Sequence, residues 1–397
     1  MMKALNNNAH PLESLLKQHC PNGVEFKELG EVCETLPKGT LKTSQLTANG
    51  YPVINSGRDL YGYYSKFNNE SNAFTIAARG EYAGFVNFMD SKFWAGGLCY
   101  PYRSNDENKL LTKFIYYHLK TNESNIMDSL VARGSIPAIN KKDIDKKLKI
   151  PLPPLEIQQK IVDILDAFTE LQAELQAELH ARRKQYEYYR NKLLSFEELQ
   201  RRTDMLNGGG LKLVSLGELG KRNAGTKITA NQMQALHKEN APVRIFAGGS
   251  TIADVDYCDL PKKDVIDKPS IICKARGYIG FEYYDKPFSH KSEFWSYTID
   301  KNANQKFVYY FLINQQEHFQ KLAKANSVKI PQLKVSNTDN FQIPLPPLSV
   351  QNDIVELLDK FDTLTNDLTS GIPAEIEARK KQYEYYRERL LSFIAKD

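Results

Sequence analysis

Ile150-Pro-Leu-Pro-Pro-Leu155 recurs letter for letter as Ile343-Pro-Leu-Pro-Pro-Leu348. A second string, ARRKQYEYYRNKLLSF at residues 181–196, recurs at 378–393 with three substitutions. The shift between the two copies is 193 residues for the first string and 197 for the second, so the second copy holds four extra residues between the strings. Self-similarity at this scale predicts that the chain is built from two related halves.

Each proline string precedes a run of apolar residues with alternating steps of four and three, which is the pattern of a coiled-coil helix. Proline is tolerated in the first turn of a helix, where amide protons lack helical partners. The alternative, a Pro-x-x-Pro ligand for a proline-reading domain, is disfavoured because the same string opens a heptad run twice. The predicted coiled-coil seam comprises Ile157, Ile161, Phe168, Leu175, Tyr186, Tyr189, Leu193, Ile354, Leu357, Phe361, Leu368, Tyr383, Tyr386 and Leu390.

The four extra residues of the second copy add about one helical turn, so its seam stays in phase. Gly371 and Pro373 lie at this insertion and predict a kink or break in the second helix. Two helices of about 45 residues would each reach about 65–70 Å and would expose a long apolar seam. We therefore expect them to pair antiparallel about a pseudo-twofold axis, with one globular domain at each end.

The segments before the two helices share short strings, among them Arg79-Gly80 with Arg276-Gly277 and Phe93-Trp94 with Phe294-Trp295. Between these strings the sequences diverge. The predicted fold class is α+β, with two similar mixed α/β globular domains joined by two long helices that form an antiparallel coiled coil. The expected parts are an N-terminal arm (1–20), a first domain (21–150), a first helix (151–200), a glycine-rich linker (201–211), a second domain (212–343) and a second helix (344–397).

Composition limits the class of protein. The 397 residues are 41% hydrophobic and 25% charged, as in ordinary globular proteins, and no apolar run approaches the ~18 residues of a membrane helix. The N-terminus shows no secretory signal, and the five cysteines are scattered, so we expect reduced thiols and a cytoplasmic protein. The net charge of +5 divides into +3 for residues 21–150, +6 for 212–343 and −4 for the rest, which suits a polyanionic partner without proving one.

Motifs of common enzymes are missing from the sequence. The chain has no G-x-G-x-x-G after a strand, no P-loop, no H-E-x-x-H and no G-x-S-x-G. Pro153-Pro154 and Pro346-Pro347 lack the flanking residues with which amino-methyltransferases hold a flipped base. We therefore expect a protein that positions other molecules, with no catalytic residue, no metal site and no cofactor of its own.

The chain resembles the specificity subunits of type I DNA restriction–modification enzymes. The resemblance rests on residues 15–32 and on both copies of the proline string and of the tyrosine string, and it covers nearly the whole chain. It implies two target-recognition domains that each read half of a bipartite DNA site, and a coiled coil that fixes the distance between the halves. It also implies docked methyltransferase subunits, two in number, and restriction–translocation subunits. S-adenosylmethionine, ATP and magnesium would then be bound by those partners.

Candidate DNA contacts are cationic and aromatic residues at loop-like positions of the two domains. Arginine can pair with two acceptors of guanine, whereas lysine more often binds phosphate. Arg79 and Arg276 are shared by both domains and are expected to hold the fold or a phosphate, while Arg58, Arg133 and Lys291 are better candidates for sequence reading. The full set comprises Arg58, Arg79, Tyr82, Lys92, Arg133, Lys227, Arg244, Arg276, Tyr278, Lys291 and Lys329.

The tyrosine strings suggest a second kind of surface. Tyr188 and Tyr385 lie off the predicted seam, with Arg190 and Arg387 nearby. Their recurrence fits either a duplicated docking surface for methyltransferase subunits or packing against the globular domains. Two alternatives remain for the chain as a whole: a coiled-coil scaffold whose domains bind protein or carbohydrate, and an enzyme with an unrecognised active site. Steep salt dependence of duplex binding would favour the DNA-binding interpretation.

Overall fold

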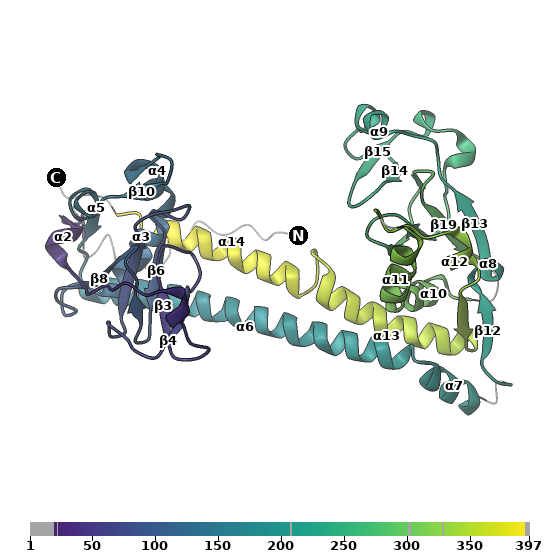
Figure 1. Cartoon of the computed structure of the whole chain (residues 1–397), viewed down its shortest axis with the longest axis horizontal. Helices are drawn as coiled ribbons and strands as arrows, with labels where there is room; N and C mark the ends of the chain where they lie inside the picture. Colours follow the sequence, from purple (N-terminus) through teal and green to yellow (C-terminus); the bar gives the residue numbers. More distant parts are fainter. Residues whose placement is uncertain (1–19, 22, 207–208, 301–302, 328, 394–397) are drawn as a thin grey trace. The chain divides into compact units, whose positions relative to one another are not determined.

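The computed structural model describes residues 20–21, 23–206, 209–300, 303–327 and 329–393, and it divides into two compact units (Figure 1). The first unit comprises residues 1–176 with 375–397, and the second comprises 177–374. The expected N-terminal arm lies almost entirely outside the described residues. Each unit combines a mixed α/β domain with parts of the long helices.

The first domain contains a four-stranded antiparallel sheet in the order β2-β8-β5-β6 and a three-stranded sheet in the order β4-β3-β7, in which β3 and β7 are parallel. Two small antiparallel pairs, β1-β11 and β10-β9, complete it. The strands are β1 (Phe26–Glu28), β2 (Cys33–Thr35), β3 (Tyr51–Ile54), β4 (Gly62–Tyr64), β5 (Ala73–Ala77), β6 (Val86–Met89), β7 (Trp94–Ala95), β8 (Cys99–Ser104), β9 (Val131–Ala132), β10 (Ala138–Ile139) and β11 (Lys149–Pro151). The helices are α2 (Leu29–Val32), η1 (Thr43–Gln45), α3 (Thr112–Thr121), α4 (Glu123–Leu130) and α5 (Lys141–Lys147).

The second domain repeats this topology except for the β10-β9 pair, which has no counterpart among its described strands. Its four-stranded sheet has the order β13-β19-β16-β17, its three-stranded sheet has the order β15-β14-β18 with β14 and β18 parallel, and β12 pairs with β20. The strands are β12 (Lys212–Ser215), β13 (Gly220–Ala224), β14 (Val243–Phe246), β15 (Ile252–Val255), β16 (Ser270–Lys274), β17 (Gly280–Tyr284), β18 (Phe288–His290), β19 (Trp295–Ile299) and β20 (Gln342–Leu345). The helices are α8 (Leu216–Leu219), α9 (Ala230–Leu236), η2 (Tyr257–Asp259), η3 (Lys262–Asp264), α10 (Gln305–Asn314), α11 (Gln316–Asn326) and α12 (Val335–Asp339). The prediction of one scaffold used twice is confirmed.

Long helices pack against each other within each unit. The helices are α6 (Leu155–Leu193), α7 (Phe196–Met205), α13 (Leu348–Asn366) and α14 (Ile372–Leu390). In the first unit, the ring of Phe168 lies 6.1 Å from that of Tyr383 and 5.6 Å from that of Tyr386. In the second unit, the Tyr186 and Tyr189 rings lie 6.2 and 5.6 Å from that of Phe361.

These helix pairs run antiparallel. In the second unit, the Arg183 guanidinium reaches the carbonyl of Thr365, whereas Tyr186, one turn later in α6, meets Phe361, one turn earlier in α13. In the first unit, the first turns of α6 share one hydrophobic core with Leu390 at the end of α14. The predicted fold class, with two mixed domains and antiparallel long helices, is therefore confirmed.

Two members of the predicted seam do not lie on it. Leu357 and Leu368 are 41% and 79% exposed, whereas Leu358 is fully buried. Leu368 follows the end of α13 at Asn366, so the helical period no longer applies to it. Leu357 faces outward because α13 packs against its own domain as well as α6, so its buried face is wider than a heptad seam and includes Val355 and Leu358.

The predicted break in the second helix is confirmed between α13 and α14. Asp367 ends α13 and accepts hydrogen bonds from the Thr369 amide at 2.7 Å and from the hydroxyl of Ser370 at 2.5 Å. A β-carbon on Gly371 would lie 2.3 Å from the carbonyl oxygen of Thr363, so glycine is needed for this close approach. Pro373 then occupies the first turn of α14, where its missing N–H does no harm.

The predicted linker begins too early. Residues 201–205 belong to α7, which is started by Ser195, whose hydroxyl accepts a hydrogen bond from the Glu198 amide. Arg201 and Arg202 both pair with Glu198 at 2.7 Å, so this polar sequence is stabilised as a helix by i,i+3 and i,i+4 ion pairs. Gly209 and Gly210 have positive φ angles, as expected of a chain reversal.

Each proline string is fastened to its domain by a buried glutamine. Gln158 accepts a hydrogen bond from the Leu111 amide at 2.8 Å and donates one to the carbonyl of Pro153 at 2.8 Å. Gln351 makes the equivalent bonds, to the Asn304 amide and to the Pro346 carbonyl, both at 2.8 Å. Both glutamines are fully buried.

A carboxylate about two turns further along each long helix adds a second attachment. Asp166 binds Lys113 at 2.7 Å and the hydroxyl of Tyr117 at 2.6 Å. Asp359 binds Lys306 and Tyr310 at the same two distances. Burial, and then the hydrogen bond to the carboxylate, raise the pKa of both tyrosines. The two units thus attach domain to helix by the same contacts.

Candidate nucleic-acid interface

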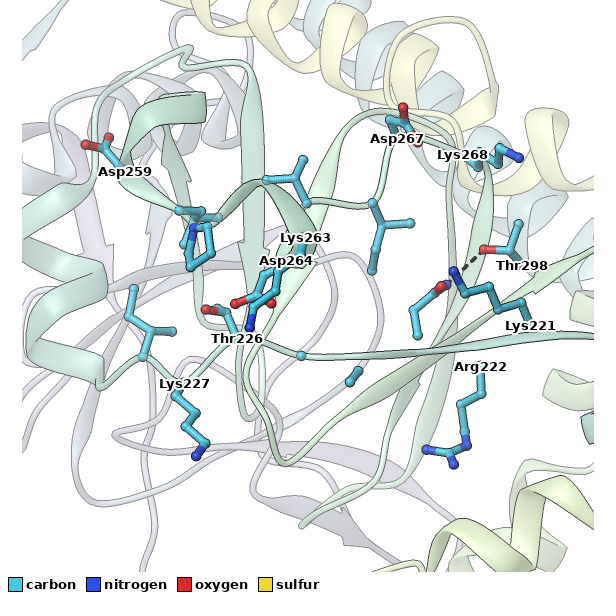
Figure 2. A pocket seen from close by; sticks show the side chains of 18 of the residues that line it. Lys221, Arg222, Thr226, Lys227, Asp259, Lys263, Asp264, Asp267, Lys268 and Thr298 are labelled. Carbon is cyan, nitrogen blue, oxygen red and sulfur yellow. Dashed lines mark hydrogen bonds between the residues drawn. The ribbon is translucent and has the colours of Figure 1, made fainter.

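A half-open cleft of about 920 Å³ lies in the second domain (Figure 2). Its walls come from β13, the loop that follows it, and the segment from η2 to the start of β16. Basic side chains line it from several directions: Lys221, Arg222, Lys227, Lys263 and Lys268.

No helix in the part of the chain that the structure describes is long and apolar enough to cross a membrane.

The loop that carries Lys227 is held tightly to its neighbours. The Thr226 amide donates to the carbonyl of His290 at 2.8 Å, and the Thr226 carbonyl accepts from the Ser292 amide at 3.0 Å. A β-carbon on Gly225 would lie 2.4 Å from the carbonyl oxygen of His290, so only glycine allows this approach. Because Thr226 is buried, the next side chain, Lys227, extends outward from a fixed point.

The charges of the cleft are mixed, which suits both phosphate and base contacts. Lys221, Lys227, Lys263 and Lys268 have no ion pair among the described residues, whereas Arg222 lies 3.4 Å from Asp339. Acidic groups alternate with these cations: Asp259, Asp264, Asp267 and Asp300. Lysine ammonium groups bind phosphate, and carboxylates accept hydrogen bonds from cytosine amino groups, so the cleft can meet both parts of a duplex.

Only Lys227 of the predicted second-domain contacts lines this cleft. Arg244 forms a two-pronged pair with Asp254, at 2.7 and 3.0 Å, that joins β14 to β15, and hydrogen bonding in this pair raises the pKa of Arg244. We therefore reassign Arg244 from DNA contact to cross-strand pair. Lys291 is 23% exposed and lies 3.4 Å from Glu293, so it is also held within the domain.

The remaining second-domain candidates are exposed. Tyr278 is 76% exposed and borders a polar hollow of about 800 Å³ together with Lys321. Arg276 lies 3.8 Å from Glu293, which is a loose pair, and Lys329 is exposed without an ion pair among the described residues. These three residues lie close together in the fold, since Arg276 forms a β-bridge with Gln332.

The first-domain candidates fall into separate places. Arg58 is in the exposed loop between β3 and β4, and its side chain is 63% exposed. Arg79 and Tyr82 lie on the loop after β5. Arg133 lies at a neighbouring hollow of about 460 Å³, where its exposed guanidinium pairs with Asp128 at 2.6 Å. Lys92 is engaged elsewhere, with Glu70 at 3.2 Å and the ring of Phe67 at 4.5 Å.

Sequence reasoning missed four of the five basic residues of the second-domain cleft: Lys221, Arg222, Lys263 and Lys268. A local signal existed, because residues 262–268 carry three lysines in seven positions. Their grouping with β13 could not be inferred, since the cleft depends on β13 pairing with β19, about 75 residues later in the chain.

The tyrosine strings adopt the same side-chain arrangement in both units. Tyr188 and Tyr385 are 60% and 50% exposed, and each lies edge-on to the next tyrosine, at 5.3 and 5.5 Å. The predicted neighbours Arg190 and Arg387 instead fold back over the rings of the tyrosines four residues earlier, each at 5.5 Å. The cations beside the exposed tyrosines are Lys192, at 5.9 Å from the Tyr188 ring, and Arg389, at 5.6 Å from the Tyr385 ring.

Sequence comparison identifies the class of this protein. Residues 21–182 and 209–378 each match the family described as type I restriction modification DNA specificity domain. These matches cover most of the chain, which therefore belongs to that family and is a type I restriction–modification specificity subunit with two target-recognition domains. The relatives are DNA specificity subunits, so the scaffold that binds protein or carbohydrate is no longer a competing interpretation.

Individual relatives span almost the whole chain. It is 31% identical to the type I restriction enzyme EcoR124I/EcoR124II specificity subunit of Escherichia coli, over 93% of this chain and 94% of that one. It is also 31% identical to a putative type I restriction enzyme specificity subunit of Haemophilus influenzae, over 98% of this chain and 100% of that one. The fold is similar to the crystal structure of a type I restriction–modification S subunit from M. genitalium, with a TM-score of 0.65 at 21% identity over 98% of both chains.

Proposed function

We propose that the two target-recognition domains read the two halves of a bipartite DNA sequence, each half through a different surface. The observation that carries this proposal is that two domains with the same two main sheets present unlike surfaces: the second has the basic cleft around Lys227, and the first has an exposed loop around Arg58. Two readers in one chain convert two weak half-site contacts into one strong interaction through effective concentration.

The chain supplies recognition, and catalysis belongs to its partners. Methyltransferase subunits, two per chain, bind S-adenosylmethionine, and restriction subunits bind ATP and magnesium. The assembly acts on DNA in the cytoplasm. Family membership supports this division of labour, as does the absence from the sequence of the common catalytic motifs.

The exposed tyrosine and cation pairs are the docking surface for the methyltransferase subunits. Tyr188 with Lys192 and Tyr385 with Arg389 form the same arrangement in both units, which suits two copies of one partner. Tyrosine and arginine are the residues that most often dominate protein interfaces. A Tyr188→Ala/Tyr385→Ala variant is expected to lose methyltransferase co-purification while its circular dichroism is retained; undiminished binding would contradict this assignment.

The reading of DNA is tested with Arg58→Ala, Lys227→Ala and two duplexes. One duplex carries the target found by methylation-site mapping, and the other has a random sequence. Arg58→Ala is expected to weaken binding to the target duplex by about 1–3 kcal/mol and to leave binding to the random duplex unchanged. Lys227→Ala is expected to weaken binding to both duplexes equally and to reduce the salt dependence of that binding. A purified wild-type assembly that methylates no defined sequence would refute the proposed function.

A further inference from the structure

One surface element is present in both target-recognition domains although the surrounding surfaces differ. A loop containing Arg-Gly is hydrogen-bonded to a loop containing Ile-Pro, and we name this element the Ile-Pro clasp. It comprises residues 78–84 and 133–139 in the first domain, and residues 275–280 and 329–333 in the second. In Figure 1 the first clasp lies beside the labels α4 and β10.

The same backbone bonds hold both clasps. In the first domain, the Gly80 amide donates to the Pro137 carbonyl at 2.8 Å, and the Ile139 amide donates to the Ala78 carbonyl at 2.9 Å. In the second domain, Gly277 donates to Pro331 at 2.8 Å, and Leu333 donates to Ala275 at 2.9 Å. In each domain these two bonds form one antiparallel β-bridge, Arg79 with Ala138 and Arg276 with Gln332, which fixes the two loops against each other at that point.

The glycines of the clasps are needed for their backbone conformation and not to make room for a close neighbour. Gly80 and Gly277 have φ angles of 99° and 81°, where other residues are strained. A β-carbon at either position would meet nothing within 4 Å. The loops therefore open toward solvent, and the conformation of each glycine sets how the preceding arginine, Arg79 or Arg276, is presented.

Apolar side chains stand exposed at the tip of each clasp. Ile136 is 50% exposed and Ile330 is 45% exposed, each directly before the proline of the clasp. A tyrosine accompanies each of them, Tyr82 at 37% and Tyr278 at 76% exposed. Single exposed apolar residues are common, but an exposed isoleucine directly before the clasp proline in two otherwise divergent domains indicates a shared contact.

Cations outnumber carboxylates along the chain around both clasps. Residues 78–84 and 129–142 together carry four cations and one carboxylate, Glu81, although Arg133 pairs with Asp128 at 2.6 Å and Lys141 with Asp145 at 2.5 Å. Residues 275–280 and 318–338 together carry five cations and no carboxylate. Arg79 and Lys329 have no ion pair among the described residues, and Arg276 has only the 3.8 Å contact with Glu293. This charge complements a polyanion, so DNA fits the surface better than a protein of mixed charge.

We infer that the Ile-Pro clasp is a sequence-independent grip on duplex DNA, used once by each domain. Arg79 and Arg276 bind phosphate, and Ile136 and Ile330 pack against the sugar of the same strand. The inference rests on the proposed function, because it assumes that both domains bind the same duplex. It adds that affinity comes partly from an element common to both domains, while discrimination comes from the surfaces that differ.

The test measures the dissociation constant of the full chain, in its methyltransferase complex, for the target duplex and for a random duplex at several salt concentrations. Arg79→Ala/Arg276→Ala removes one phosphate contact per domain. It is expected to lower the slope of log K against log salt by about 2 on both duplexes. Lys109→Ala/Lys360→Ala is the control, since it removes the same charge from exposed sites that pair with Asp106 and Glu356.

A second variant separates packing from charge. Ile136→Ser/Ile330→Ser removes apolar contact but no cation, so affinity is expected to fall about 5- to 30-fold on both duplexes with an unchanged salt slope. Circular dichroism and methyltransferase co-purification, both expected to match the wild type, show that the fold and the assembly are intact.

Several outcomes would overturn the inference. One is an unchanged salt slope for the arginine variant, and another is a loss of affinity confined to the target duplex. A third is a loss of methyltransferase binding, which would make the clasp a protein-docking surface. A wild-type complex that binds no duplex would overturn the proposed function as well, whereas a variant indistinguishable from the lysine control overturns this inference alone.

Discussion

Removing the buried glutamine that fastens the second domain to α13 should destabilise that domain strongly. Gln351→Ala deletes the acceptor of the Asn304 amide and the donor to the Pro346 carbonyl, both bonds being 2.8 Å long. Each polar group left without a partner costs about 1–3 kcal/mol when buried. Because the Asn304 amide is only partly buried, we expect a total loss of about 3 kcal/mol in the free energy of unfolding.

The two tryptophans of the chain make the measurement domain-specific. Trp94 lies in the first domain and Trp295 in the second. The indole nitrogen of Trp94 is buried without a partner among the described residues, so Trp94→Phe removes an unsatisfied group and leaves Trp295 as the only indole fluorophore. Urea unfolding of Gln351→Ala in this background, followed by tryptophan fluorescence, reports on the second domain.

Asn352→Ala is the matched control for this experiment. Asn352 also accepts a hydrogen bond from Asn304, at 2.9 Å, but it is exposed, so water can replace it. We expect its loss to change the free energy of unfolding by less than about 1 kcal/mol. If Gln351→Ala behaved like Asn352→Ala, the buried amide would not hold the domain to the helix, and the reasoning would be wrong.

Three further predictions concern the helix, the pH dependence and one reassigned residue. Inserting four residues beside Glu174 lengthens α6 by about 6 Å, and if this helix sets the unread gap, methylation-site mapping should show a spacer longer by about one or two base pairs; an unchanged spacer would contradict this. Burial lowers the pKa of His118 and His290 to about 4, so below about pH 6.5 the unfolded chain takes up protons that the folded chain does not. The free energy of unfolding should therefore fall between pH 7 and pH 5, by about 2 kcal/mol per histidine at pH 5. Calorimetry measures this, and a flat profile would contradict it. Arg244→Ala should lower the free energy of unfolding by about 1 kcal/mol through the loss of its pair with Asp254 while target affinity is unchanged, and weakened target binding in a stable variant would restore it as a DNA contact.

The architecture was predictable because it is repeated. Two copies of a proline string and a tyrosine string placed the long helices, and Gly371 with Pro373 placed the break between α13 and α14. The errors arose where a helix has more than one neighbour. Leu357 fits a heptad yet lies exposed, because α13 also packs against its own domain and thereby buries Leu358.

The candidate interface was much less predictable than the fold. Arg244 and Lys227 are both cations in loop-like sequence, but a carboxylate on the neighbouring strand neutralises the first and not the second. That difference depends on the register of β14 against β15, which the sequence does not state. Lys221 and Lys268 were missed for a related reason, since they lie more than 40 residues apart and meet only through the sheet.

The paired attachments of Gln158 with Asp166 and of Gln351 with Asp359 have an evolutionary consequence. The partner groups that both domains supply are a backbone amide, a lysine and a tyrosine, and none of them belongs to the basic cleft or to the loop around Arg58. A replacement domain that keeps these few contacts would be held correctly whatever sequence it recognises. A single recombination event that replaces the gene segment encoding the residues between the repeated strings could therefore change the target of the whole enzyme.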